Sequence, residues 1–224
     1  MAHTARRAIC RVHRRVSFDV SGEPRMRLPV AAMGVAAHSG WAAVVALGRT
    51  SNGPLVLARS RVDLIEDGFP ESKQPYHAVE ALALEEASQR LNRYRRQAEA
   101  KATSALHRLQ EDVTGREFRL KSVGILESSG RKGSSLQSIL ASHAAIHSAD
   151  GDHFRSALST AAQALGLTVS RVPARDLDTR AAACLHQTLN HLGDAVRQLG
   201  KQVGSPWGAD QKQAALLAWL LLEM

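Results

Sequence analysis

Residues 118–173 limit the possible folds of this chain more than any other stretch, because they have the pattern of a strand, a long helix and a second strand. Residues 118–126 alternate apolar and polar side chains and then become fully apolar, as in a strand that enters the interior of a sheet. A helical apolar period follows over residues 136–165, and residues 167–173 have the pattern of the next strand. Such a unit requires a parallel sheet and a right-handed crossover.

Glu127 is the first candidate functional residue, because ligands of open α/β sheets bind beyond the carboxyl ends of the strands. A carboxylate there can act as a metal ligand or a general base, and a solvated residue at a strand end is the simple alternative. The Gly- and Ser-rich loop that follows contains Arg131 and Lys132, which are candidate nucleic-acid-binding residues. Its backbone N–H groups could contact phosphate, but it lacks the spacing of a P-loop, and a surface loop is the favoured interpretation.

Three antiparallel strands in a meander are predicted before this unit. Residues 30–37 and 41–48 are apolar, and the turn His38-Ser-Gly separates them. Asn52-Gly53 is the strongest short hairpin signal, and residues 55–66 alternate in their second half. The chain is therefore predicted to be an α/β protein with a mixed five-stranded sheet, in which the meander joins the strand–helix–strand unit.

A long helix is predicted between the meander and this unit. It begins at Pro75, where a missing N–H costs least, and Gly115 stops it. Uninterrupted, the apolar face over residues 75–113 would extend for ~57 Å, which is more than a domain of this size can cover. We therefore expect the helix either to break near residues 100–103 or to project and form a homodimer through residues 75–113.

Two more helices are predicted after the second strand. Asp176 or Asp178 caps a helix that ends at Gly200. The last helix runs from Ala209 to about Glu223 and has so little polar surface that it should be buried against the sheet.

The formal net charge of +8 lies mostly in residues 1–29, where seven arginines stand against two acidic residues. This N-terminal arm is predicted to be disordered, and residues 30–224 form the predicted domain. The arm could contact nucleic acid, act as a transit-like presequence, or be an extension with Met26 or Met33 as alternative starts. Aromatic residues make up only 4% of the chain, which leaves little material for base stacking.

Cysteine use and hydropathy indicate where the protein works. Cys10 and Cys184 allow neither a disulfide framework nor a CxxC site, which favours a reducing compartment. The longest apolar run, residues 214–222, is too short for a bilayer span of roughly 20 residues. The N-terminus has no hydrophobic secretory region. We expect a cytoplasmic protein with no membrane partner.

The order of the predicted elements resembles the ribonuclease H-like fold, and in particular its Holliday-junction resolvase (RuvC-like) branch, over roughly residues 30–223. The order is three meander strands, helix, strand, helix, strand, helix and final helix. Three short motifs also resemble an uncharacterised bacterial family of this shape, namely His38–Trp41, Ser142–His147 and Pro206–Lys212. The second resemblance implies a fold and no established activity.

The resemblance to the resolvase branch implies phosphodiester hydrolysis, in which about three or four carboxylates hold two Mg²⁺ or Mn²⁺ ions ~3.5–4 Å apart. In that branch the carboxylates come from the first strand, the end of the fourth strand and the final helix. This assigns Glu127 and Asp210 as metal ligands. The first strand departs from the pattern, because Ala36 stands where the enzymes of the fold have an Asp, with His38 nearby.

Three histidines and one lysine complete the candidate residues. His38, in the turn after the first strand, is a possible acid/base group near neutral pH. His143 and His147 are spaced i, i+4, so two imidazoles on one helix face could share a transition metal or be hydrogen-bonded core residues. Lys212 could bind a phosphate oxygen or be a surface lysine. His77, at the predicted start of the long helix, is interpreted as structural.

Two functions are consistent with these residues. The favoured one is a non-catalytic member of the fold that binds DNA or RNA, or a protein partner, because Ala36 replaces the first-strand Asp. The alternative is a metal-dependent nuclease or resolvase-like phosphodiesterase, with Glu127 and Asp210 as ligands and His38 or His143 in support. The residues leave open whether the chain is an enzyme.

Overall fold

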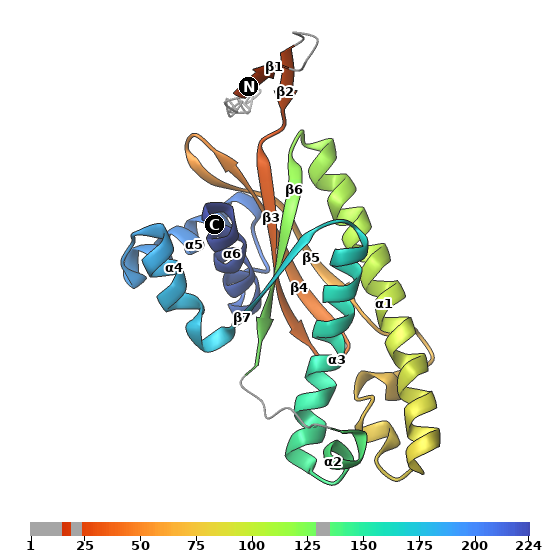
Figure 1. Ribbon diagram of the computed structural model, residues 1–224. Coiled ribbons are helices and arrows are strands. Elements are labelled where there is room, and N and C mark those ends of the chain that lie inside the picture. The colour runs from red at the N-terminus through yellow and green to blue at the C-terminus, as the bar shows by residue number, and fades with distance from the viewer. Residues whose placement is uncertain (1–14, 19–23, 129–134) are drawn as a thin grey trace, which may run out of the picture.

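The computed structural model describes residues 15–18, 24–128 and 135–224 (Figure 1). Two short antiparallel strands of the N-terminal arm, β1 (Arg15–Phe18) and β2 (Pro24–Arg27), form a sheet of their own. Residues 1–14 and 19–23 of that arm lie outside the described residues, as do Arg131 and Lys132, so the predicted disorder of the arm stays a prediction. The main sheet has five strands: β3 (Val30–His38), β4 (Trp41–Thr50), β5 (Gly53–Asp63), β6 (Arg119–Glu127) and β7 (Thr168–Pro173).

The order of the strands in the main sheet is β5-β4-β3-β6-β7. The first three pair antiparallel, whereas β6 runs parallel to β3 and β7 runs parallel to β6. This order confirms the predicted meander, the strand–helix–strand unit and the ribonuclease H-like fold class. Because β3, β6 and β7 are parallel, their carboxyl ends lie at the same edge of the sheet.

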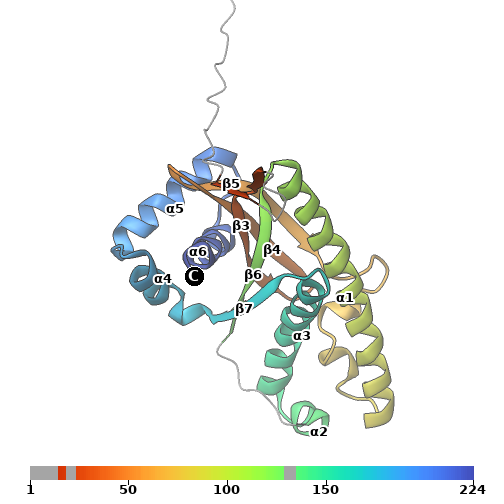
Figure 2. The same cartoon turned by 45° about the horizontal axis from the view of Figure 1, so that its top comes forward.

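Helices cover both faces of the sheet (Figures 1 and 2). Ala31, Met33 and Val35 of β3 pack on the side of α1 and α3, whereas Ala32 and Ala36 pack on the side of α4, α5 and α6. This alternation follows from the two-residue period of a strand. The helices are α1 (Leu84–Gly115), α2 (Leu136–Leu140), α3 (His143–Ala164), α4 (Leu177–Leu185), α5 (Leu189–Val203) and α6 (Ala209–Glu223).

The long helix α1 begins at Leu84, nine residues after the predicted start at Pro75. The segment before it forms two 3₁₀ helices, η1 (Pro70–Lys73) and η2 (His77–Val79). The first residues of the predicted apolar helix face therefore belong to a folded loop. The predicted break near residues 100–103 does not occur, and the 32-residue helix is continuous for ~48 Å.

The first part of α1 is covered by parts of the chain other than the sheet. From Ala98 onward its buried side chains join the main core between α1, α3 and the sheet. Ala87 and Tyr94, nearer its start, form a separate small core with Val79, against which Leu136 and Leu140 of α2 pack. This second lobe accounts for the length of the helix within one chain. The predicted homodimer through residues 75–113 stays a prediction.

Two other predicted helices are each divided in the structure. The pattern over residues 136–165 breaks before α3, because the Ser142 side chain accepts a hydrogen bond from the Ala145 N–H and caps a new helix. The helix predicted up to Gly200 is interrupted at His186, which has a left-handed backbone (φ 52°), and Thr188 then caps α5. Within the described residues, no helix is long and apolar enough to span a membrane.

The last helix, α6, is buried against β3 and β6 as predicted, and glycines let its backbone come close to the strands. A Cβ atom on Gly34 would lie 1.9 Å from the carbonyl oxygen of Ala214. A Cβ on Gly124 would lie 2.6 Å from the side chain of Leu217. Neither strand position has room for a side chain, so α6 sits directly on the sheet.

We expect Gly34→Ala to destabilise the protein by roughly 3 kcal/mol, because the new methyl group meets backbone atoms of α6 that cannot rotate away. Gly115→Ala is the matched control, because nothing lies within 4 Å of the position that its Cβ would take and alanine favours a helix. The control should leave stability unchanged or raise it by up to about 1 kcal/mol. Urea unfolding followed by circular dichroism measures both variants. A Gly34→Ala variant as stable as the wild type would contradict the close α6–β3 contact.

Candidate functional site

His38 and Asp210 meet at the carboxyl edge of the sheet. His38 ends β3, and Asp210 lies in the first turn of α6, whose close packing on Gly34 holds that turn beside the strand. The Nε2 atom of His38 is 3.0 Å from Oδ1 of Asp210. The His38 ring also stacks on Trp41, with ring centroids 4.4 Å apart. The structure therefore brings together two of the predicted site residues from distant parts of the sequence.

Glu127 ends β6 at the same edge and faces a basic partner. Its carboxylate lies 3.2 Å from Nε of Arg171, on the neighbouring strand β7. A second arginine, Arg61 of β5, lies 3.9 Å above the ring of Trp41 and contacts Asp63 at 3.2 Å. The carboxylates of this edge thus face basic side chains.

The carboxyl edge does not assemble a metal-binding set of three acidic or histidine ligands among the described residues. Among these residues, the only such group lies elsewhere, on α3 and η2. Ala36, which stands at the predicted position of the first-strand Asp, is buried in the core under α6. A longer, charged side chain there would have to displace this packing.

His143, predicted as a supporting residue of the Glu127 site, lies away from the carboxyl edge. Arg155 of α3 contacts the residue after Glu127, with Nη2 2.9 Å from Oγ of Ser128. His143 precedes Arg155 by twelve residues, which is roughly 18 Å along the helix axis. The structure therefore separates His143 from the carboxyl edge.

Lys212 is exposed on α6 two residues after Asp210. Side chains two residues apart on a helix point about 200° apart around its axis, so Lys212 lies on the side away from the His38 contact. It borders a cleft of about 220 Å³ between α5 and α6, lined also by Leu192 and Leu216.

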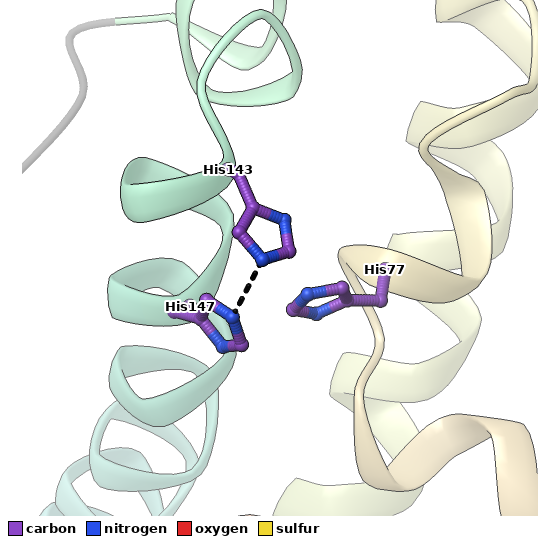
Figure 3. A group of neighbouring side chains, drawn as sticks. All are labelled: His77, His143 and His147. Atoms are coloured by element: carbon purple, nitrogen blue, oxygen red, sulfur yellow. Dashed lines mark hydrogen bonds between the residues drawn. The ribbon is translucent and has the colours of Figure 1, made fainter.

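A cluster of three histidines lies in the second lobe (Figure 3). His143 and His147 come from the first two turns of α3, and His77 comes from η2. The Nε2 atoms of His143 and His147 are 3.0 Å apart, and the His77 ring centroid lies 5.3 and 4.5 Å from those of His143 and His147. One donor atom of each ring can be chosen so that all three lie within 4.8 Å of one another.

Asp150 holds His77 in this cluster. Its side chain is buried, Oδ2 lies 2.5 Å from Nδ1 of His77, and Oδ1 accepts a hydrogen bond from the Tyr76 N–H at 2.7 Å. Burial raises the pKa of Asp150, and the hydrogen bonds from Tyr76 and His77 oppose that rise. A carboxylate on Nδ1 fixes the ring so that Nε2 carries the free lone pair.

His77 and Asp150 are the residues of this cluster that the sequence pattern does not reveal. His77 lies 66 residues before His143, and no local pattern joins the two, which is why the sequence favours a structural role for it. Asp150 follows His147 by three residues, so a carboxylate on the same face of the predicted helix is the one available signal.

No protein-family model matches the chain, and no curated protein matches it. Among solved structures, the chain is similar to Thermus thermophilus RuvC, with 14% identity over 85% of this chain and 92% of that chain and a TM-score of 0.49. The same protein in complex with a Holliday junction substrate gives 13% identity over 85% and 91% of the two chains and a TM-score of 0.48. The chain is also similar to the yeast mitochondrial Holliday junction resolvase Ydc2, with 9% identity over 86% of this chain and 78% of that chain and a TM-score of 0.47. The fold class rests on the strand order described above.

His153 is a largely buried histidine between α1 and α3. Its ring lies at the α1–α3 contact, edge-on to Tyr76 and Phe154, and Nε2 is buried with no hydrogen-bond partner among the described residues. Burial lowers the pKa of His153 to about 4, although a hydrogen bond to the Tyr94 backbone opposes the change. The unfolded chain, with a pKa near 6.5, therefore binds this proton more readily than the folded chain.

We expect His153 to contribute its full stability above about pH 6.5 and to lose up to about 3 kcal/mol as the pH falls to 4. His153→Gln removes this titration, so the stability difference between wild type and variant should shrink over that interval. His191→Gln, on an exposed residue of α5, is the control and should follow the wild type. Urea unfolding at pH 7, 5.5 and 4 measures the three proteins; parallel curves for His153→Gln and wild type would contradict the buried, neutral ring.

Proposed function

We propose that this chain is a nucleic-acid-associated ribonuclease H-like protein whose strand-end site binds without cleaving. The observation that carries the proposal is the buried Ala36, which fills the first-strand position with core packing. Two-metal hydrolysis needs about three or four carboxylates around one point. Here Asp210 contacts His38, and Glu127 contacts Arg171. This pairing supports a site that has kept the shape of the fold without its hydrolytic ligands.

The charges at the carboxyl edge suit contact with a phosphate backbone. Arg61 lies at the end of β5, and Arg175 follows the end of β7; their side chains are 57% and 72% exposed. Arg61 pairs with Asp63, and Arg175 pairs with Asp176. Exposed ion pairs contribute only about 0–1 kcal/mol to stability, so a phosphate oxygen can take the place of either carboxylate. The planar guanidinium group then binds phosphate through two hydrogen bonds. The net charge of +8 favours the same class of partner.

We expect the full chain to bind branched and duplex DNA with an affinity that falls steeply with salt. Arg61→Gln and Arg175→Gln should each reduce the slope of log K against log salt concentration by about 1, because each removes one phosphate contact. Arg90→Gln, on the exposed start of α1, is the matched control and should keep the wild-type slope. Fluorescence anisotropy at several salt concentrations measures the slopes. The absence of binding, or unchanged slopes in both edge variants, would contradict the proposed surface.

We also expect no cleavage of the branched DNA in Mg²⁺ or Mn²⁺, measured with labelled strands on denaturing gels. The branched substrate is the sharpest choice because the element order resembles the junction-resolving branch. Cleavage that disappears in both Glu127→Ala and Asp210→Ala would instead favour the metal-dependent nuclease. Glu85→Ala, in the exposed first turn of α1, is the control for loss of a carboxylate in the second lobe.

A further inference from the structure

We infer that His77, His143 and His147 form a binding site for one divalent transition metal of the zinc class, separate from the carboxyl edge of the sheet. The three residues come from two elements, and their rings point toward one another in the second lobe (Figure 3). This inference goes beyond the proposed function and does not depend on it.

The distances within the cluster suit a tetrahedral site. Zn–N bonds are about 2.0–2.1 Å long, so two nitrogen ligands of a tetrahedral ion lie roughly 3.3 Å apart. The Nε2 atoms of His143 and His147 are already 3.0 Å apart. All three donor atoms lie within 4.8 Å of one another, so small side-chain rotations bring them to one ion.

The backbone holds the ligands before any metal arrives. The side chain of Ser142 caps α3, which fixes the first turn and places His143 one helical turn before His147. On the other side, buried Asp150 binds both the ring of His77 and the N–H of Tyr76. One carboxylate therefore orients the η2 ligand and ties its backbone to α3.

Asp150 also supplies the chemistry that a metal-bound histidine requires. A ligating imidazole usually donates its other N–H to a carboxylate, which fixes the tautomer and makes the ligand more basic. Asp150 stands in that relation to His77, because Oδ2 contacts Nδ1 and leaves Nε2 for the ion. The buried negative charge also offsets part of the charge of a dication.

The donor set selects the class of ion. Imidazole nitrogens suit zinc and its transition-metal neighbours, whereas Mg²⁺ and Ca²⁺ prefer oxygen ligands. Three protein ligands leave the fourth tetrahedral position for water or another exogenous donor. Because His143 and His147 are exposed, that position can be reached from solvent. The site joins η2, at the base of α1, to α3, so the ion would also fasten the second lobe together.

The test is titration of the full, EDTA-treated chain with Zn²⁺ by calorimetry, together with Co²⁺ as a spectroscopic probe. We expect one Zn²⁺ per chain at this site and the intense visible absorption of tetrahedral Co²⁺. His143→Ala and His147→Ala should each weaken Zn²⁺ binding by at least about 100-fold and abolish the Co²⁺ spectrum. His107→Ala, an exposed histidine on α1, is the matched control and should bind as the wild type does.

Asp150→Asn tests the orienting contact, and it should lower Zn²⁺ affinity by roughly 10- to 100-fold. Because Asp150 is buried, the melting temperature of each metal-free protein is measured first. The exposed His143 and His147 variants should fold as the wild type does, and Zn²⁺ should raise the melting temperature of the wild type and of His107→Ala but not of these two variants. The inference is overturned if Zn²⁺ does not bind, if it binds equally well to His143→Ala and His147→Ala, or if bound Co²⁺ is octahedral.

Discussion

The direct contact of α6 with β3 and β6 shapes both the core and the edge of the sheet. Gly34 lets the backbone of α6 approach that of β3 directly, and Gly124 leaves room for the Leu217 side chain against β6. The apolar helix can then cover the central strands, and Ala36 lies buried beneath it. The same contact fixes the first turn of α6 at the end of β3, which places Asp210 beside His38.

The length of α1 explains why the protein has a second, smaller core. The sheet can cover only part of a ~48 Å helix, and the free part would expose apolar side chains to water. Apolar side chains of η2 and α2 cover this part of the helix and build a small core with Ala87 and Tyr94. The histidine cluster lies between η2 and the start of α3.

The two lobes consequently carry different chemistry. At the carboxyl edge, Glu127 and Asp210 each face a basic side chain. In the second lobe, neutral nitrogen donors gather around one point and a buried carboxylate orients one of them. The proposed metal site on η2 and α3 is thus separate from the strand ends.

Local periodicity and residue identity are enough to predict the sheet, its meander and the buried last helix. They place the boundaries of the helices less well, since the Ser142 and Thr188 caps and the left-handed His186 interrupt apolar periods that continue across them. The sites, by contrast, arise from tertiary packing. Only packing brings His38 to Asp210 and His77 to α3, because side chains far apart in sequence meet only where the core forces their elements together.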